Sequence, residues 1–256
     1  MTRVVRTTEA KHEGDQASYA LYDKEAERYD RLRYESAEKR FFNDLELRLL
    51  HESIPLGLGS RLLDVPTGTG RLSVALAATE ATIVGGDLSQ GMLRVASKKA
   101  TAKQLENVAF TQLSGDRLPF GDDTFDAVIS FKFFHLVPND LKPIFVREMT
   151  RVLKPGGALV VEFNSPFYGG ILSFLRYYFQ KKRPGGMRMK CLFPDQVRPL
   201  FKGLQVTRIR GVKLPMSGRL QALFGTRRVA TVNHWFGKLP GIKYLSYAIV
   251  VEARKR

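Results

Sequence analysis

The chain has 256 residues, of which 44% are hydrophobic and 17 are phenylalanine, which suffices for one large α/β domain with a proper core. Its single cysteine, Cys191, excludes an intrachain disulfide framework, and its four histidines lack paired ligand spacing, so no metal site is expected. The net charge is +16, yet residues 1–164 carry −1, while residues 165–256 carry 19 Lys/Arg against 2 Asp/Glu.

The first residues of the chain are polar. The segment MTRVVRTTEAKHEGDQ has no apolar run of the kind found in a signal peptide, and its acidic residues argue against a transit peptide. We therefore expect a flexible arm over residues 1–18 and a cytoplasmic protein. The next segment, SYALYDKEAERYDRLRYES, has apolar and aromatic residues at helix-like spacing and predicts a helix.

Residues 61–96 hold the most informative pattern of the chain. A short apolar strand reaches Asp64, Pro66 ends it because proline has no N–H, and a turn with Gly68 and Gly70 opens a helix. A second apolar run ends in Asp87, 17 residues beyond Gly70. Strand, glycine loop, helix, strand and acidic residue form the first half of a nucleotide-type cofactor site.

The glycine loop by itself is compatible with more than one cofactor. GTGRLS approaches the G-x-G-x-x-G pattern of NAD-binding loops, with Ser73 in place of the third glycine. An NAD site does not account for Asp64, nor for the later segment SGDRLPFGDDTFDAVISF at residues 114–131. Thr67 or Thr69 is predicted to cap the helix that follows the loop.

Two further segments complete the expected core. FDAVISF, at the end of residues 114–131, predicts a buried strand. The end of this strand, from Ser130 to Phe134, should line the pocket of the cofactor site. The following NDLKPIFVREMTRVLKPGGALVVEF predicts a helix, a Pro-Gly-Gly turn and another apolar strand, with Val146 and Met149 contributing only to the core.

Together these segments resemble the class I S-adenosylmethionine-dependent methyltransferases, and among them the type-11 group that contains the quinone-biosynthesis enzymes. The resemblance covers about residues 20–164 and returns at the last strand, YAIVVEAR. It implies an α/β, Rossmann-like fold with a mostly parallel seven-stranded sheet, an antiparallel last strand and an N-terminal helical cap. Pro66 and Thr67 depart from the pattern, because many relatives carry Gly and Cys there.

The resemblance also implies how S-adenosyl-L-methionine would be held. Asp64 would face its amino acid end, Asp87 would accept hydrogen bonds from the two ribose hydroxyls, and Asp116 would accept one from the adenine amino group. The apolar side chains after Asp87 would contact adenine and ribose, and the backbone after Asp116 would meet the ring edge. The expected cofactor-binding residues are Asp64, Pro66, Thr67, Gly68, Gly70, Asp87, Leu88, Met92, Asp116, Arg117, Leu118 and Phe131.

Methyl transfer from a sulfonium depends mainly on alignment, and a base is needed only if the acceptor must lose a weakly acidic proton. His135, just after the strand FDAVISF, is the candidate base, with packing or hydrogen bonding as its alternative role. Tyr29 is the second catalytic candidate, because it resembles a residue of the helix that closes over the cofactor. Packing alone is its alternative.

The basic third of the chain predicts an anionic partner. FYGGILSFLRYYF, at residues 167–179, is too short to span a bilayer, and Lys181, Lys182 and Arg183 follow it. The segment suits either a helix at a membrane interface or a helix of the substrate pocket, and both roles can hold. Further along, Trp235, Phe236, Tyr244 and His234 are candidates for substrate contact.

We therefore predict methylation of a lipophilic small molecule, a quinone-type or lipid precursor, at carbon or oxygen and in peripheral contact with an anionic membrane. One alternative is an RNA methyltransferase, because basic and aromatic residues also suit single-stranded RNA. No RNA-binding module is recognisable, however, and the Asn/Asp-Pro-Pro-Tyr/Phe tetrapeptide is absent. The other alternative is a non-catalytic cofactor-binding scaffold. The expected divisions are an arm over 1–18, a cofactor-binding core over 19–164 and a substrate-binding region over 165–256.

Overall fold

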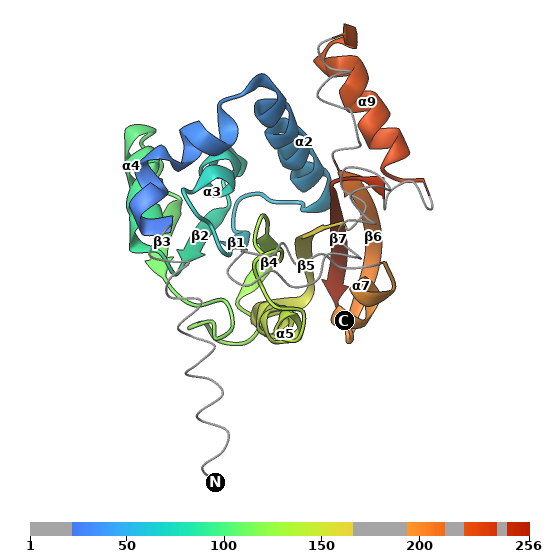
Figure 1. Ribbon diagram of the computed structural model, residues 1–256. Helices are drawn as coiled ribbons and strands as arrows, with labels where there is room; N and C mark the ends of the chain where they lie inside the picture. Colours follow the sequence, from blue (N-terminus) through green and yellow to red (C-terminus); the bar gives the residue numbers. More distant parts are fainter. Residues whose placement is uncertain (1–21, 166–193, 213–222, 240–244) are drawn as a thin grey trace, which may run out of the picture.

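The computed structural model describes residues 22–165, 194–212, 223–239 and 245–256 (Figure 1). The expected arm over residues 1–18, the apolar segment 167–179 with the lysines and arginine that follow it, Cys191 and Tyr244 lie outside these ranges. The helix expected near the N-terminus spans residues 22–34.

Seven strands form one sheet in the order β3-β2-β1-β4-β5-β7-β6. All neighbouring pairs are parallel except the two that involve β7, which is antiparallel to both β5 and β6. The mostly parallel sheet with an antiparallel last strand is therefore confirmed. The strands are β1 Arg61–Asp64, β2 Thr82–Asp87, β3 Val108–Gln112, β4 Phe125–Ser130, β5 Leu153–Asn164, β6 Leu204–Val212 and β7 Ala248–Lys255.

Helices cover both faces of the sheet, because parallel strands are buried on both sides and their connections cross over. On one face, α2 and α3 pack on side chains such as Leu62, Ile83 and Ile129. On the other face, α5 and α7 pack on Leu63 and Val128. The helices are α2 Ala37–Ser53, α3 Arg71–Leu76, α4 Gln90–Ala102, α5 Lys142–Val152, α7 Pro194–Leu200 and α9 Thr226–Phe236, with a short 3-10 turn, η1 Ala77–Thr79.

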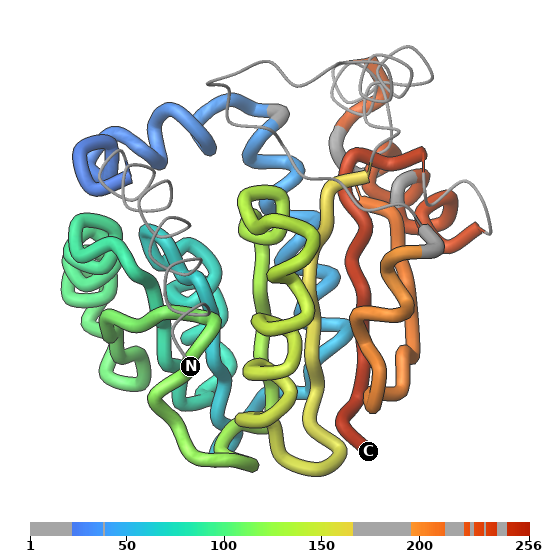
Figure 2. Tube along the Cα trace, turned by 60° about the horizontal axis from the view of Figure 1, so that its bottom comes forward, coloured from blue at the N-terminus to red at the C-terminus, as the bar shows by residue number. Residues whose placement is uncertain are grey.

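The carboxyl edge of the parallel strands is the part of the fold that matters for function, because ligands of open α/β sheets bind outside that edge. β1, β2 and β4 end there at Asp64, Asp87 and Ser130. The helix over residues 22–34 crosses above this edge and leads into α2 (Figure 2). The predicted N-terminal helical cap is thus present, and it roofs the loop that follows β1.

None of the helices in the described ranges combines the length and apolarity needed to cross a membrane.

Candidate functional site at the carboxyl edge of the sheet

Asp64, at the end of β1, is fully buried and braces the glycine loop from beneath. Its Oδ2 accepts hydrogen bonds from the Thr67 hydroxyl at 2.9 Å and the Ser73 hydroxyl at 2.7 Å. Burial raises the pKa of Asp64 to about 6, and the two hydroxyl hydrogen bonds oppose that rise. The carboxyl group therefore lies at the base of the loop, where its ionisation is unfavourable.

The prediction that Thr67 or Thr69 caps α3 is wrong. The N-cap is Gly70, with left-handed backbone and no side-chain cap. The Thr67 hydroxyl is directed down to Asp64, and the Thr69 hydroxyl donates to Asp30 at 2.6 Å. The two threonines join the loop to the strand below and to the helix above, because buried hydroxyls next to carboxylates bond to them in preference to a distant backbone N–H.

The two loop glycines serve different purposes. Gly68 and Gly70 have φ of +55° and +71°, which side chains rarely tolerate. A Cβ on Gly70 would lie 2.8 Å from the Cβ of Ala96, so this glycine allows α4 to pack closely against the loop. A Cβ on Gly68 would have no atom within 4 Å, so the loop leaves open space beside Gly68. That space lies where a ligand is expected.

Asp87, at the end of β2, is buried and tied to the same loop. Its Oδ2 accepts from the Gly68 N–H at 2.8 Å, and its Oδ1 accepts from the Ser89 N–H at 2.9 Å. Burial raises the pKa of Asp87, and the backbone hydrogen bonds counteract this. Each carboxylate oxygen has a second lone pair, so both remain able to accept one hydroxyl each.

The helix over residues 22–34 is fastened to this edge by polar contacts near both of its ends. Asp23 accepts hydrogen bonds from the Gly91 N–H at 2.8 Å and from the Ser89 hydroxyl. Asp30 accepts from Thr69 and pairs with Lys99. Between these points Met92, one of the expected cofactor contacts, is buried against the helix, and its neighbours include Tyr22 and Tyr29. Leu88 follows Asp87 directly and is half-buried.

Tyr29 faces Tyr22 and Tyr34 edge-on, with ring centroids 6.1 and 6.2 Å away. Burial is the main cause that raises its pKa above the ordinary value for tyrosine. The phenol is therefore protonated at neutral pH. In this environment Tyr29 can donate a hydrogen bond but cannot act as a phenolate base.

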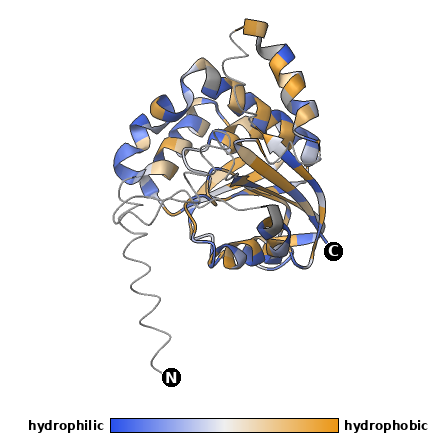
Figure 3. Ribbon diagram, turned by 45° about the vertical axis from the view of Figure 1, so that its right-hand side comes forward, coloured by the Kyte–Doolittle hydropathy of each residue, from blue (hydrophilic) through white to orange (hydrophobic). Residues whose placement is uncertain are grey.

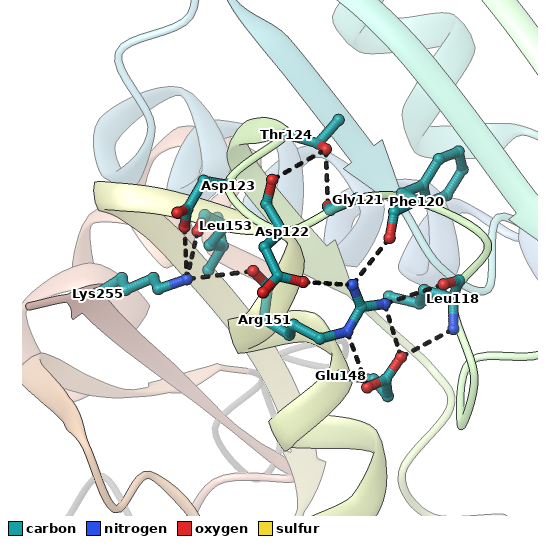
Figure 4. A network of polar contacts seen from close by, with 10 residues as sticks. All are labelled: Leu118, Phe120, Gly121, Asp122, Asp123, Thr124, Glu148, Arg151, Leu153 and Lys255. Atoms are coloured by element: carbon teal, nitrogen blue, oxygen red, sulfur yellow. Dashed lines mark hydrogen bonds and ion pairs between the residues drawn. The ribbon is translucent and has the colours of Figure 1, made fainter.

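The loop after β3, expected to meet adenine, is held rigidly from α5 (Figure 4). Arg151 donates to the carbonyls of Leu118 and Phe120 at 2.9 and 2.8 Å and to the Asp122 carboxylate at 2.8 Å. Glu148 accepts from the Leu118 N–H at 3.1 Å and pairs with Arg151. The Leu118 N–H already donates to Glu148, so an adenine ring that contacts this loop would have to bond to other atoms of it.

The remaining residues of that loop leave polar groups at its surface. Asp116 is half-buried and accepts from the Ser114 hydroxyl at 2.5 Å, while Arg117 is exposed. Leu118 itself is buried in the core with Val65. The carboxylate of Asp116 retains acceptor capacity, as an amino group would require.

The end of β4 is more buried than the sequence suggested. Phe131 belongs to the core beneath α2, and Phe134 is fully buried on the opposite face of the sheet. Ser130 is also fully buried, and its hydroxyl has no hydrogen-bond partner among the described residues. An unpaired buried hydroxyl at the carboxyl edge is unusual and suits a site that receives a polar ligand.

Lys132, which the sequence analysis did not single out, follows β4 with a left-handed backbone, φ +57°. Its N–H donates to Glu162 at 3.1 Å, and its ammonium pairs with Glu162 and with Glu46, 2.7 Å away. Arg71 pairs with the other oxygen of Glu46 at 2.8 Å. Burial alone lowers the pKa of Lys132, but the two glutamates outweigh it and hold the pKa above its usual value.

This buried cluster (Arg71, Glu46, Lys132 and Glu162) is formally neutral and joins α2, α3, β4 and β5. Strained backbone in a non-glycine residue persists where the surroundings hold it, and such positions gather at functional sites. A signal was available in the sequence, since a lysine immediately after a strand of apolar residues, in SFKFF, has to find a partner. Glu46 lies 86 residues before Lys132 by the numbering, and nothing in the sequence indicates the pairing.

His135 lies just beyond Lys132 and is half-buried. Burial lowers its pKa to about 4; nearby Glu162 opposes this, while Lys132, Arg33 and Lys142 contribute to it. The imidazole is therefore neutral at physiological pH; it can accept a hydrogen bond, and it is a weaker base than a free imidazole.

A cavity of about 260 Å³ lies away from the glycine loop, between α2, β6 and α9. Its lining includes Leu49, Glu52, Arg210 and His234. Arg210 pairs with Glu52 at 2.5 Å and with Glu252 at 2.6 Å. His234 lines this cavity, whereas Trp235 and Phe236 are exposed. The expected contact of these three side chains with a substrate stays a prediction.

Comparison with known proteins gives a consistent result. The family model described as "Methyltransferase domain" matches residues 62–157. The demethylmenaquinone methyltransferase of Thermus thermophilus is 38% identical over 164 residues, which are 60% of this chain and 73% of the relative. That of Mycobacterium sp. strain KMS is 34% identical over 182 residues, 69% of this chain and 72% of the relative.

Solved structures support the fold. A SAM-dependent methyltransferase of Thermotoga maritima superposes with a TM-score of 0.65 at 17% identity, covering 93% of this chain and 100% of that one. At this identity the likeness speaks for the architecture, and it confirms the Rossmann-like class I fold.

Proposed function

Because this chain belongs to the class I S-adenosylmethionine-dependent methyltransferases of the menaquinone and ubiquinone biosynthesis type, we propose that it methylates a lipophilic quinone precursor. The relatives carry the name demethylmenaquinone methyltransferase, and we take the reduced quinone, a naphthoquinol, as the acceptor. The observation that carries the proposal is the pair of buried carboxylates, Asp64 and Asp87, that flank an open left-handed glycine loop under a fastened helix.

The residues of this edge fit S-adenosylmethionine. We propose that Asp87 binds the ribose hydroxyls, that Asp116 binds the adenine amino group, and that the amino acid end lies over the loop braced by Asp64. The open space beside Gly68 would let the ligand approach the backbone of the loop. The other proposed contacts are Pro66, Thr67, Gly70, Leu88, Met92, Arg117 and Phe131.

When bound, S-adenosylmethionine supplies a methyl group on a sulfonium, so that a new bond to the acceptor forms as the carbon–sulfur bond breaks and one proton leaves the acceptor. We propose that neutral His135 accepts that proton from an acceptor hydroxyl. Tyr29, which keeps its proton, donates a hydrogen bond and helps to exclude water. The cluster around Lys132 holds the end of β4 in place beneath the acceptor.

We also propose the finer assignments that follow from this function. The core over residues 19–164 binds the cofactor, and the basic region over residues 165–256 binds the substrate. The protein acts in the cytoplasm, in peripheral contact with an anionic membrane, because a prenylated quinone partitions into lipid. RNA is the competing anionic partner, favoured only by the charge of the last third.

Titration calorimetry with S-adenosylmethionine tests the cofactor site. Asp87→Ala should weaken binding at least about a hundredfold, because two charge-assisted hydrogen bonds are lost. Asp126→Ala is the control: this carboxylate accepts from the Arg61 N–H and pairs with Lys154 at the start of β4, away from the loop. Equal binding by wild type and Asp87→Ala would refute the site.

Transfer of radiolabelled methyl to a naphthoquinol with a short prenyl chain tests the acceptor. His135→Gln should lower kcat more than it raises KM, and the loss should be smaller for an acceptor whose hydroxyl is more acidic. If the radiolabel appeared only in RNA from a cell extract and never in the quinol, RNA would be the methyl acceptor and the quinone would not.

A further inference from the structure

Exposed apolar side chains gather in one segment of the described chain. Of nine large hydrophobic residues that are exposed in the described ranges, seven lie between residues 223 and 245. The segment contains α9, which projects from the side of the sheet formed by β6 and β7 (Figures 1 and 3). Exposed apolar residues are ordinarily scattered, so a concentration of this kind indicates an interaction surface.

α9 carries both buried and exposed apolar residues. Val229 and Ala230 are buried against Phe41 of α2 and attach α9 to the fold. Val232, Trp235 and Phe236 have the spacing i, i+3 and i+4 on the helix, Leu239 follows in the turn after it, and all four are exposed, Trp235 by 67%. We call these four residues, with Leu223 and Phe224 at the amino-terminal end, the outer face of α9.

Basic groups border the outer face. Arg228 is exposed beside it, and the Lys238 ammonium lies 6.0 Å from the centroid of the Trp235 ring. Residues 165–256 as a whole carry 19 Lys/Arg and 2 Asp/Glu. An apolar stripe with an indole, flanked by cations, is the pattern of a helix that lies in the interface of an anionic membrane.

The outer face lies at the functional edge of the sheet. β6 is parallel to β5, so it ends at the same edge as β4, and α9 lies between the end of β6 and the start of β7. The Gly211 N–H donates to the Gly237 carbonyl at 2.8 Å, which fixes the carboxyl end of α9 beside the end of β6. A surface that α9 touches is therefore next to the proposed acceptor site.

We propose that the outer face of α9 docks the enzyme on an anionic lipid bilayer and brings the acceptor site to the membrane surface. The proposal rests on the proposed function, since a quinone with a prenyl chain resides in the bilayer. A second copy of the chain is a poorer occupant, because two basic regions, each with a net +17, would face one another. A phospholipid headgroup supplies the complementary charge.

Trp235 is the only tryptophan, so its fluorescence reports on the outer face directly. The full chain is mixed with vesicles of phosphatidylglycerol and phosphatidylcholine in equal parts, and with vesicles of phosphatidylcholine alone. We expect a blue shift and quenching by brominated acyl chains with the anionic vesicles, and a weaker response with the neutral ones. No change in emission with either vesicle would overturn the proposal.

Two sets of variants separate the apolar from the electrostatic contribution. Phe236→Gln with Leu239→Gln keeps the reporter and should weaken vesicle binding about tenfold or more. Arg228→Gln with Lys238→Gln should weaken binding to anionic vesicles about fivefold per charge. Leu58→Gln is the matched control, since Leu58 is 88% exposed but precedes β1 at the opposite edge. Equal losses in Leu58→Gln would overturn the assignment.

Three controls keep this proposal apart from the function on which it rests. All variants should bind S-adenosylmethionine like the wild type. If the wild-type protein itself did not bind S-adenosylmethionine, the proposed function would be refuted, but membrane docking would not. Self-association that disappears in Phe236→Gln with Leu239→Gln would assign the face to a second copy. Salt-sensitive RNA retention through the same residues, with no vesicle binding, would assign it to RNA.

Discussion

The carboxyl edge under the helix over residues 22–34 and the outer face of α9 differ in which kind of side chain is buried and which is exposed. At the edge, the carboxyl groups of Asp64, Glu46 and Glu162 are buried, and protein groups satisfy them. On α9, apolar groups are exposed, and the cations Arg228 and Lys238 lie beside them. A closed polar site suits a small ligand, whereas an open apolar stripe bordered by cations suits an extended surface.

The largest effect is expected where the buried cluster is broken. Lys132→Met removes the cation that pairs with buried Glu46 and Glu162, and we expect the free energy of unfolding to fall by about 3–5 kcal/mol. Lys154→Met, which removes a half-exposed partner of Asp126, should change it by about 0.5 kcal/mol or less. Chemical denaturation measures both. Similar losses for the two variants would show that the edge is no more tightly paired than the surface.

The second effect concerns pH. Folding raises the pKa of Asp64 from 3.8 to about 6, so its protonated form favours the folded state, and this contribution is lost as pH rises through 4 to 6. Asp64→Asn keeps an acceptor for the Thr67 and Ser73 hydroxyls but has no charge to bury. Its free energy of unfolding relative to wild type should rise by about 3 kcal/mol between pH 3.5 and pH 7, as estimated from the shift in pKa.

Denaturation curves at several pH values check this. A difference between the two proteins that does not vary with pH would mean that Asp64 is already ionised and solvated in the folded state.

A smaller effect is expected from the clamp over the adenine loop. Arg151→Met removes hydrogen bonds to Leu118, Phe120 and Asp122, and we expect a loss of about 2 kcal/mol in the free energy of unfolding. Affinity for S-adenosylmethionine should fall with it, because the loop is no longer held in its binding shape. Arg147→Met, on the same helix, provides the comparison; an equal drop in affinity would exclude a special role for Arg151.

The smallest effect is expected on α9. Trp235→Gln should change the free energy of unfolding by about 0.5 kcal/mol or less, because the side chain is mostly exposed and attaches nothing to the core. Far-UV circular dichroism follows unfolding in both proteins. A loss of several kcal/mol would show that the indole is part of the fold, and the contrast between the two regions would disappear.

The sequence predicted the architecture well because its signals are local. Apolar strands and glycine turns can be recognised from neighbouring residues, and so can the carboxylates Asp64 and Asp87 that end two of the strands. It failed where partners are distant in the chain. Thr69 binds Asp30, and Lys132 binds Glu46, and neither pairing has a pattern that spacing reveals. Nor did the sequence indicate that Trp235 is exposed, since the spacing of apolar residues on a helix does not show which of them are buried.

The placement of β7 has a consequence for the order in which the sheet is completed during synthesis. Among the strands of the described ranges, β6 pairs with β7 alone, and β7 lies between it and β5. When a ribosome has made residues up to Val212, β6 therefore has no neighbour, and β5 presents an unpaired apolar edge. Both gaps close only with residues 248–255, so nascent chains should be most prone to wrong pairing until those residues have been made.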